Sequence, residues 1–402
     1  MTLQTAKNTV VNFKVETTYT TPAGPGGGET LRKLDSPGLN LAITPIRSGE
    51  SRPSGMRSMG RNGSRNVPGS FNAEALQGAH DTIHEAWMRS TWAAPLVIDE
   101  GTSGAAASIT TTTSTIVGNA GSWITAGLRV GDVIRLTDHV AHVHNGQNLR
   151  IRALTATVIT VHGTPLVLDA GADSAYTITR GKKIINGAAP VRRTFEIEQN
   201  NVDIDASQVF GGCRYISAKL NGTPDDMATW EFGVLGANMR IVTGAAAPYY
   251  TAPTTYDGDP LVFADARINL NGVDIAVATS FELMNVIEAA TTPVIGSVVS
   301  PDVFDNDGEV SGSFTMLRED FDRVSAYEAE TEFELHILLR GASGESAEYL
   351  SVFVPRVKFT GVTAQLGGTG GMLETVTFQT GPKRVTAGYD ASTITLCTAV
   401  AS

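Results

Sequence analysis

The chain has only two cysteines among its 402 residues, Cys213 and Cys397, and they lie far apart in the sequence. Two cysteines cannot supply the disulfide framework of a small secreted domain, and the absence of a C-x-x-C pair disfavours a zinc site. We expect free thiols in a protein that folds in the reducing cytosol. The sequence has no apolar run of about 18 residues, which a membrane span needs. It also lacks a basic segment followed by an apolar run at its start, so we expect no secretory signal and a soluble cytoplasmic product.

The sequence has no common catalytic motif. It contains no G-x-S-x-G, no P-loop, and no G-x-G-x-x-G between a strand and a helix. The glycine-rich run 367–371 has no lysine and no following helix, so it predicts a turn. Because no nucleophile is paired with a base in a known pattern, a hydrolase is disfavoured. We expect no enzyme activity and no cofactor.

The seven histidines give weak metal signals. His80 and His84 have the i, i+4 spacing of a helical metal pair, but the HExxH order is absent, so a helix face that packs or faces solvent is favoured. His139, His142 and His144 form the densest group, and a strand holding the last two could bind a transition metal. A loop with chance histidines is the favoured interpretation, and we predict no metal site.

The composition favours a folded, β-rich protein. Hydrophobic residues make up 42% of the chain and charged residues 18%, and its 42 glycines suit turns and strands better than helices. The length indicates two or three domains. Residues 186–402 carry 13 basic and 28 acidic side chains, a net charge of −15. Tight DNA binding is disfavoured because phosphate affinity comes from Lys and Arg, but a surface that DNA passes without sticking is compatible with this charge.

Residues 45–66 form an arginine-rich, Gly/Pro-interrupted stretch, which predicts an extended arm or a long hairpin loop. Its arginines are Arg47, Arg52, Arg57, Arg61 and Arg65. A short strand at Val67–Phe71 follows. Asn72 is then expected to cap a helix over residues 72–90, with Leu76, Ile83 and Trp87 on its apolar face.

Residues 99–185 are predicted to be an inserted small β-barrel or sandwich. A low-complexity Thr/Ala/Gly stretch leads into this module, and short strands alternate with turns such as Gly131-Asp132 and Asn145-Gly146. Strands are expected at 123–124, 133–136, 149–151 and 158–161. The remaining segments are 1–98 and 186–385, which together form the main domain, and 386–402, a C-terminal arm.

From residue 193 the strand signals are stronger. Asn271-Gly272 between two alternating runs predicts a hairpin with a type I′ turn. In the strand that begins at Glu332, the side chains of Phe333 and Leu335 share a buried face, while Glu332, Glu334 and the later His336 share a solvent-facing one. A second helix is expected over 319–329. Further strands are expected at 194–198, 216–220, 281–286, 310–317, 332–339, 350–359 and 375–380.

The sequence also contains an internal echo. Val67-Pro-Gly-Ser-Phe71 precedes the first expected helix, and Val310-Ser-Gly-Ser-Phe314 precedes the second. Each helix is followed by a Phe-Glu-aliphatic strand start, at Phe195 and at Phe333. A match in the same strand–helix–strand context predicts two related halves, with 99–185 spliced into the first half after its helix.

This order of elements resembles that of the major tail tube proteins of long-tailed, siphovirus-type bacteriophages. The resemblance covers 1–95 and 186–385. The segments that carry it are Arg47–Arg65, Val67–Phe71 with its helix, Phe195–Gln199, Gly211–Gly236 and Val310–Gly341. Residues 99–185 lie outside it and are similar to the small β modules that decorate phage tubes, which leaves their role open.

The resemblance implies a mainly β fold, a sandwich or half-barrel with two flanking helices. It further implies that six subunits close into a homohexameric ring with a continuous inner β-barrel, and that rings stack into a tube for DNA ejection. Implied partners are copies of the chain, the tape measure protein and tail-end proteins, with transient passage of double-stranded DNA. The implied location is the virion tail, after assembly in the host cytoplasm.

Two surfaces would serve this function. The five arginines of 45–66 are a hypothesis for the arm that stacks rings, since Arg binds carboxylates with defined geometry. A solvated loop, or one packed on its own subunit, is the alternative. Glu332 and Glu334 are candidates for a negative lumen wall that repels DNA, against the alternative that acidic residues only keep the exterior soluble.

A second function remains open from sequence alone. The chain could be a virion or cell-surface β-sandwich that binds carbohydrate or a host surface, with 99–185 as the binding module. Exposed aromatics clustered in that module would favour this function. The module contains only Trp123 and Tyr176, which argues weakly against it.

Overall fold

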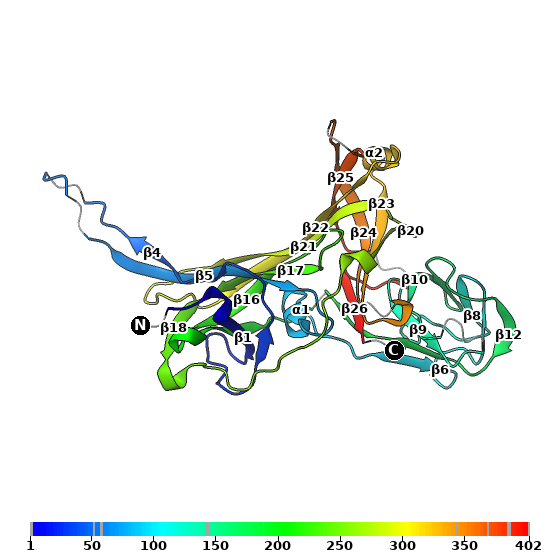
Figure 1. Cartoon of the computed structure of the whole chain (residues 1–402), viewed down its shortest axis with the longest axis horizontal. Coiled ribbons are helices and arrows are strands. Elements are labelled where there is room, and N and C mark those ends of the chain that lie inside the picture. Colours follow the sequence, from blue (N-terminus) through cyan, green and yellow to red (C-terminus); the bar gives the residue numbers. More distant parts are fainter. Residues whose placement is uncertain are drawn as a thin grey trace.

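The computed structural model describes residues 3–50, 53–56, 59–140, 145–187, 189–341, 344–367, 370–383 and 387–400. Within these ranges the protein is mainly β, with two α-helices and two open sheets (Figure 1). In the described part of the chain, no helix has the length and apolar character that crossing a bilayer requires.

Most strands belong to one large 18-stranded sheet, whose strands contribute most of the main hydrophobic core. Its first strands in the chain are β1 (Thr9–Glu16), β2 (Glu29–Leu31), β3 (Gly38–Leu39), β4 (Ala42–Ile46), β5 (Arg61–Glu74), β14 (Lys182–Ile185), β15 (Thr194–Asn201), β16 (Ala206–Gly222), β17 (Thr229–Gly236) and β18 (Asn238–Thr243). The later ones are β19 (Arg267–Leu270), β20 (Val273–Asp274), β21 (Ala278–Thr291), β22 (Val303–Leu317), β23 (Glu332–Arg340), β24 (Tyr349–Ala364), β25 (Leu373–Thr380) and β26 (Thr395–Ala399). The strands expected between residues 194 and 380 are confirmed, and most are longer than predicted.

A smaller eight-stranded sheet has its own core, built around Trp123 and Tyr176. Its strands are β6 (Leu96–Asp99), β7 (Ile109–Thr111), β8 (Thr115–Gly118), β9 (Val133–Thr137), β10 (Leu149–Leu154), β11 (Val158–Val161), β12 (Asp169–Asp173) and β13 (Thr177–Arg180). We call residues 96–180 the small sheet unit. Residues 123–124 form a turn and not the predicted strand, whereas the low-complexity stretch before them contains β7 and β8. β14, which follows, pairs with β26 of the large sheet.

The helices are shorter than predicted, at α1 (Asp81–Trp87) and α2 (Asp322–Glu328). The prediction that Asn72 caps the first helix is wrong. Asn72 lies in β5 opposite Glu231 of β17, because β5 continues to Glu74 and gains a full ladder of strand hydrogen bonds. The predicted apolar face is confirmed for Ile83 and Trp87, which α1 buries, whereas Leu76 is buried before the helix begins, in a bridge with Pro260. Short 3-10 segments occur at Ala6–Asn8, Val202–Ile204, Gly244–Ala246, Phe263–Asp265 and Gly344–Ser346.

The predicted hairpin at Asn271-Gly272 is confirmed. β19 and β20 pair directly, and both turn residues have positive φ, 50° for Asn271 and 90° for Gly272. Type I′ turns need this conformation, and Asn-Gly adopts it at low cost.

The prediction that Glu332, Glu334 and His336 share a solvent-facing side of β23 is only partly correct. His336 is buried, and the centroid of its ring lies 5.8 Å from that of His162 in the small sheet unit.

The chain builds one structural unit twice. The first unit consists of β3–β4, β5, α1, β15, β16 and β17, and the second of β21, β22, α2, β23, β24 and β25. The strands of both units pair in the same order. In the first unit this order is β3–β4, β5, β17, β16 and β15. In the second unit it is β21, β22, β25, β24 and β23. Residues 88–193 connect α1 to β15, whereas residues 329–331 connect α2 to β23. The internal echo in the sequence therefore corresponds to a repeated fold.

The two units also share their residue register. Leu39 lies opposite Gly69 in the first hairpin, as Leu283 lies opposite Gly312 in the second. β15 and β23 both slip register against their partners after their Phe-Glu starts, at Phe195 and Phe333. Such slips bend a strand and change its partner along its length. The two units are thus the same arrangement in detail.

A glycine explains part of the shared Gly-Ser-Phe motif. A Cβ atom on Gly69 would lie 2.2 Å from the carbonyl oxygen of Gly38, and one on Gly312 would lie 2.4 Å from that of Glu282. In both hairpins the neighbouring backbone passes too close for any side chain. The same close approach of the neighbouring strand therefore requires glycine at this position in both halves.

Candidate assembly surfaces

The arginine-rich stretch forms a hairpin that leaves the body of the protein. β4 pairs with the first half of β5, and Ile43 lies opposite Arg65 while Ile46 lies opposite Arg61. Figure 1 shows β4 and the adjoining part of β5 projecting from one end of the molecule. We call residues 42–66 the arm. Long connections that leave a compact body commonly carry function.

The described arginines of the arm have different surroundings. Arg47 and Arg61 are exposed, while Arg65 lies half-buried at the base. The backbone N–H of Arg65 donates to the carbonyl of Val298 at 2.8 Å, and its guanidinium donates to Oδ1 of Asn238 at 3.5 Å. Within the described ranges, none of the three forms an ion pair with a carboxylate. Arg52 and Arg57 lie outside the described residues.

Apolar side chains accompany the charges along the arm. Ile46 is 60% exposed, Met56 70% and Met59 96%. Met and Arg are enriched where proteins contact each other, because both cover apolar surface and adapt their shape. The arm therefore combines exposed apolar side chains with exposed positive charge.

The two glutamates predicted for a lumen wall both contact cations of the same chain. Glu332 accepts from Arg356 at 2.5 Å, and this hydrogen bond lowers the pKa of Glu332. Glu334 contacts Nζ of Lys383 at 2.8 Å and accepts from the Tyr389 hydroxyl at 2.6 Å. Each carboxylate lies beside a positive group of the same chain, so these positions add little net negative charge to the surface.

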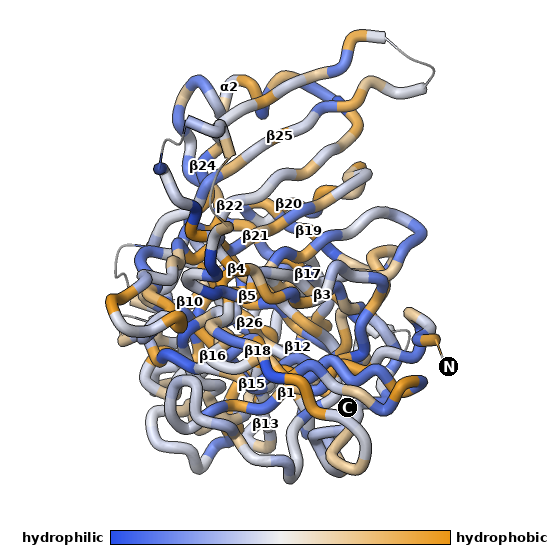
Figure 2. Tube along the Cα trace, turned by 90° about the vertical axis from the view of Figure 1, so that its left-hand side faces the viewer, coloured by the Kyte–Doolittle hydropathy of each residue, from blue (hydrophilic) through white to orange (hydrophobic). Residues whose placement is uncertain are grey.

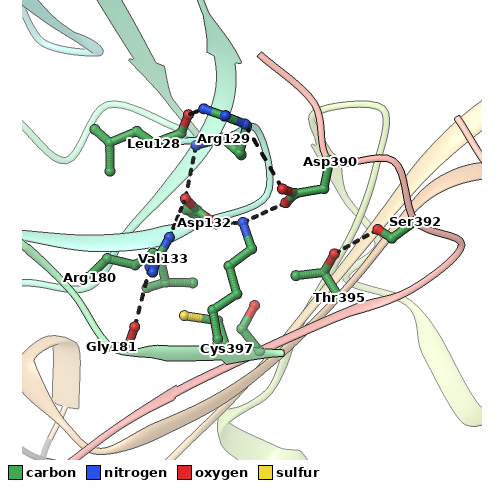
Figure 3. Close-up of polar contacts among 12 residues, drawn as sticks. Leu128, Arg129, Asp132, Val133, Arg180, Gly181, Asp390, Ser392, Thr395 and Cys397 are labelled. Carbon is green, nitrogen blue, oxygen red and sulfur yellow. Dashed lines mark hydrogen bonds and ion pairs between the residues drawn. The ribbon is translucent and has the colours of Figure 1, made fainter. Parts of the chain in front are cut away.

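A buried charge cluster joins the small sheet unit to the large sheet (Figure 3). Asp132 is fully buried, contacts Nζ of Lys183 on β14 and lies 3.6 Å from the guanidinium of Arg180. Nζ of Lys183 also lies 2.5 Å from Asp390, which precedes β26. Buried charges need such partners, because removing one partner of a buried ion pair destabilises the fold by about 3–5 kcal/mol. The sequence indicated only the Gly131-Asp132 turn and gave no signal of its partners.

His80, His84 and His139 are all buried in the structure. His80 and His84 are buried, and burial lowers the pKa of His80 to about 4. His84 accepts from the indole N–H of Trp87 at 3.0 Å. His139 is buried near two aspartates, whereas His142 and His144 lie outside the described residues. The described residues contain no group of three or more His, Cys, Asp or Glu side chains that could hold a metal ion.

One open strand edge lies at the end of β24. β25 pairs with β24 as far as Ala364, but the pairing of β23 on the other side ends at Lys358. The backbone N–H of Gln365 donates to the carbonyl of Leu373 at 3.1 Å, so the polar groups of Val362 and Ala364 point away from β25. No described strand pairs with them there. Figure 2 shows β24 and β25 at one end of the molecule, beside α2.

A second open edge lies along β3 and β4. The backbone N–H of Asn40 donates to Pro68 at 3.4 Å, so Leu39 and Leu41 point their backbone groups away from β5. The Gln199 side chain takes both groups of Leu39: its Nε2 donates to the carbonyl at 2.9 Å, and its Oε1 accepts from the N–H at 3.1 Å. No described strand covers the edge from Leu41 onward. Open edges are reactive toward other strands, and proteins usually pair or block them.

The comparisons with known proteins agree with this architecture. The model of the phage tail tube protein family matches residues 6–380, which is most of the chain. A search of curated proteins found no match. Because the family model spans both repeats and the connection between them, the chain belongs to the phage tail tube protein family.

Proposed function

We propose that copies of this chain close into rings, and that the rings stack into the hollow tail tube through which DNA leaves a long-tailed, siphovirus-type virion. The observation that supports the proposal most is the pair of open strand edges, on β24 and on β3–β4, in a chain of the tail tube family. A sheet that closes through its neighbours removes such edges. The role is structural and needs no catalysis.

The arm is proposed to hold successive rings together. It presents Arg47 and Arg61 without carboxylate partners in the described residues, beside the exposed Met56 and Met59. The chain carries a net charge of −11, so an arm of this kind meets acidic surface on a neighbouring ring. Arg–carboxylate contacts give orientation as well as attraction.

The acidic residues of 186–402 are proposed to bias the lumen toward negative potential, so that DNA slides without binding. Glu332 and Glu334 would contribute weakly, because each is paired with a cation of its own chain. Other proposed partners are the tape measure protein inside the tube and the proteins at its ends. Assembly would take place in the host cytoplasm.

The small sheet unit, which contains most of the predicted inserted module 99–185, is proposed to decorate the outside of the tube. The Asp132–Lys183–Asp390 cluster fixes its position against the large sheet. Carbohydrate binding has no support in this unit, because Trp123 and Tyr176 are buried in its core and offer no exposed aromatic surface.

Negative-stain microscopy of the purified chain at increasing concentration tests the proposal. We expect rings with a central hole, and tubes where rings stack. Particles that stay monomeric at every concentration and ionic strength would contradict it.

A further inference from the structure

The structure already contains one joint between repeats. β16 of the first unit pairs antiparallel with β21 of the second, from Ser217 opposite Val286 to Gly222 opposite Phe281. The joint is tightly packed, because Leu220 is fully buried and Leu283 is only 3% exposed. The hairpin strand of one unit therefore completes the sheet of the other.

The equivalent positions at the other ends of the two units have no strand partner in the described structure. β24 occupies in the second unit the place that β16 has in the first, and β3–β4 occupies in the first unit the place of β21. Within one chain these two edges lie at different ends of the molecule, as Figure 1 shows. They cannot meet each other, but each can meet the complementary edge of another copy.

We propose that the end of β24 in one copy pairs antiparallel with β3–β4 of the next copy, in the register of the β16–β21 joint. This rests on the proposed function. Val362 then lies opposite Leu41 of the neighbour, as Ala218 lies opposite Asn285, and Thr363 lies opposite Asn40. Because the joint is head-to-tail, successive copies generate a ring when the rotation closes.

The backbone directions fit this register. Val362 and Leu41 both point their N–H and C=O groups to the open sides of their strands, as the hydrogen bonds of Gln365 and Asn40 to the inner strands establish. Thr363 and Asn40 then form a pair without direct backbone hydrogen bonds. Side chains approach most closely in such pairs. Both Thr363 and Asn40 are exposed in the single chain.

Gln199 has a specific part in this joint. Its carboxamide holds the N–H and C=O of Leu39, the residue equivalent to Leu283, whose partner in the chain is Leu220. The side chain occupies the place of a strand backbone in the single copy. When the joint extends to Leu39, Ala364 of the neighbouring copy replaces the Gln199 carboxamide as the hydrogen-bond partner of Leu39.

Cysteine cross-linking of the full-length chain tests the register. The variant Asn40→Cys/Thr363→Cys places one thiol on each edge, opposite each other between copies. The native Cys213 and Cys397 are buried and do not compete. In the reference variant Lys219→Cys/Met284→Cys the thiols occupy the same relationship inside one chain. In the control variant Ala42→Cys/Gln365→Cys they are four residues out of register, about 13 Å apart along the strand and beyond disulfide reach.

Assembled protein is oxidised mildly and run on a non-reducing gel, with the same samples viewed by microscopy. We expect a ladder of linked chains for Asn40→Cys/Thr363→Cys, an internal cross-link without a ladder for the reference variant, and neither for the control. Rings or tubes without this ladder would overturn the joint and leave the proposed function standing. A ladder of equal strength in the control would also overturn the register. Absence of rings in every variant and in the unmodified chain would overturn both.

Discussion

Leu220 of β16 lies directly opposite Leu283 of β21, and this buried pair joins the two structural units within one chain. The first unit supplies the open side of its β16, and the second supplies its hairpin strand. A single chain therefore contains one completed joint and half of each of two others. We expect assembly to repeat between chains a contact that folding has already made once within each chain.

The first prediction concerns the stability of that internal joint. Leu220→Ala removes a fully buried side chain and is expected to lower the free energy of unfolding by about 2–5 kcal/mol, as measured by urea denaturation of the monomer. Leu366→Ala is the control, because Leu366 is 90% exposed beyond the end of β24. It is expected to change monomer stability by less than about 0.5 kcal/mol. Equal effects of the two changes would contradict the packing described at the joint.

The second prediction concerns the open edge of β24. Val362→Pro removes an N–H that faces no described partner, so we expect assembly to be blocked while the monomer unfolds at nearly the same urea concentration. Thr363→Pro is the matched control. Its N–H faces β25, so this change breaks a ladder inside the chain and is expected to lower monomer stability. Sedimentation velocity and urea denaturation measure the two effects. Normal rings from Val362→Pro would show that this edge is not used.

The third prediction concerns the arm. Arg47→Glu/Arg61→Glu reverses two exposed charges and is expected to stop tube elongation while rings and solubility persist. The conservative variant Arg47→Lys/Arg61→Lys retains the charge and is expected to elongate, with weaker geometric preference. Light scattering follows elongation, and microscopy separates rings from tubes. Tubes of normal length from the charge-reversed variant would remove the arm from ring stacking.

The fourth prediction concerns pH. Burial raises the pKa of Glu16 from 4.5 to about 7, partly offset by hydrogen bonds from the backbone N–H groups of Gly212 and Thr20. Between these two pH values the folded chain keeps a proton that the unfolded chain releases, so this group's contribution to stability falls as pH rises through the window. Glu16→Gln removes this dependence. We expect its stability relative to the unmodified chain to rise from pH 4.5 to 7 and to level off above. Parallel stability–pH curves for the two proteins would contradict the assignment.

The repeated fold could be predicted from the sequence because the same steric requirement places a glycine in the same short motif of both halves. Gly69 and Gly312 lie where another backbone passes, and no side chain fits there. The Gly-Ser-Phe motif therefore survives in both halves. The Asn271-Gly272 hairpin was predictable for a similar reason, since its turn needs two positive φ angles.

Other features depend on contacts between distant residues and could not be predicted. Asn72 has the chemistry of a helix cap, yet pairing with β17 extends β5 through it. The low-complexity stretch before Trp123 resembles a linker, but β7 and β8 form there because the small sheet unit supplies their partners. The capture of Leu39 by Gln199 joins residues 160 positions apart, which no local pattern reveals.

The most direct test of the central claim is a density map of the assembled protein by cryo-electron microscopy, at a resolution that separates strands. We expect a closed ring in which β24 of each chain lies beside β3–β4 of the next, with Val362 opposite Leu41, so that each chain contributes two equivalent units to one continuous sheet. A ring in which these two edges stay apart, or in which the two units of a chain occupy unlike positions, would contradict it.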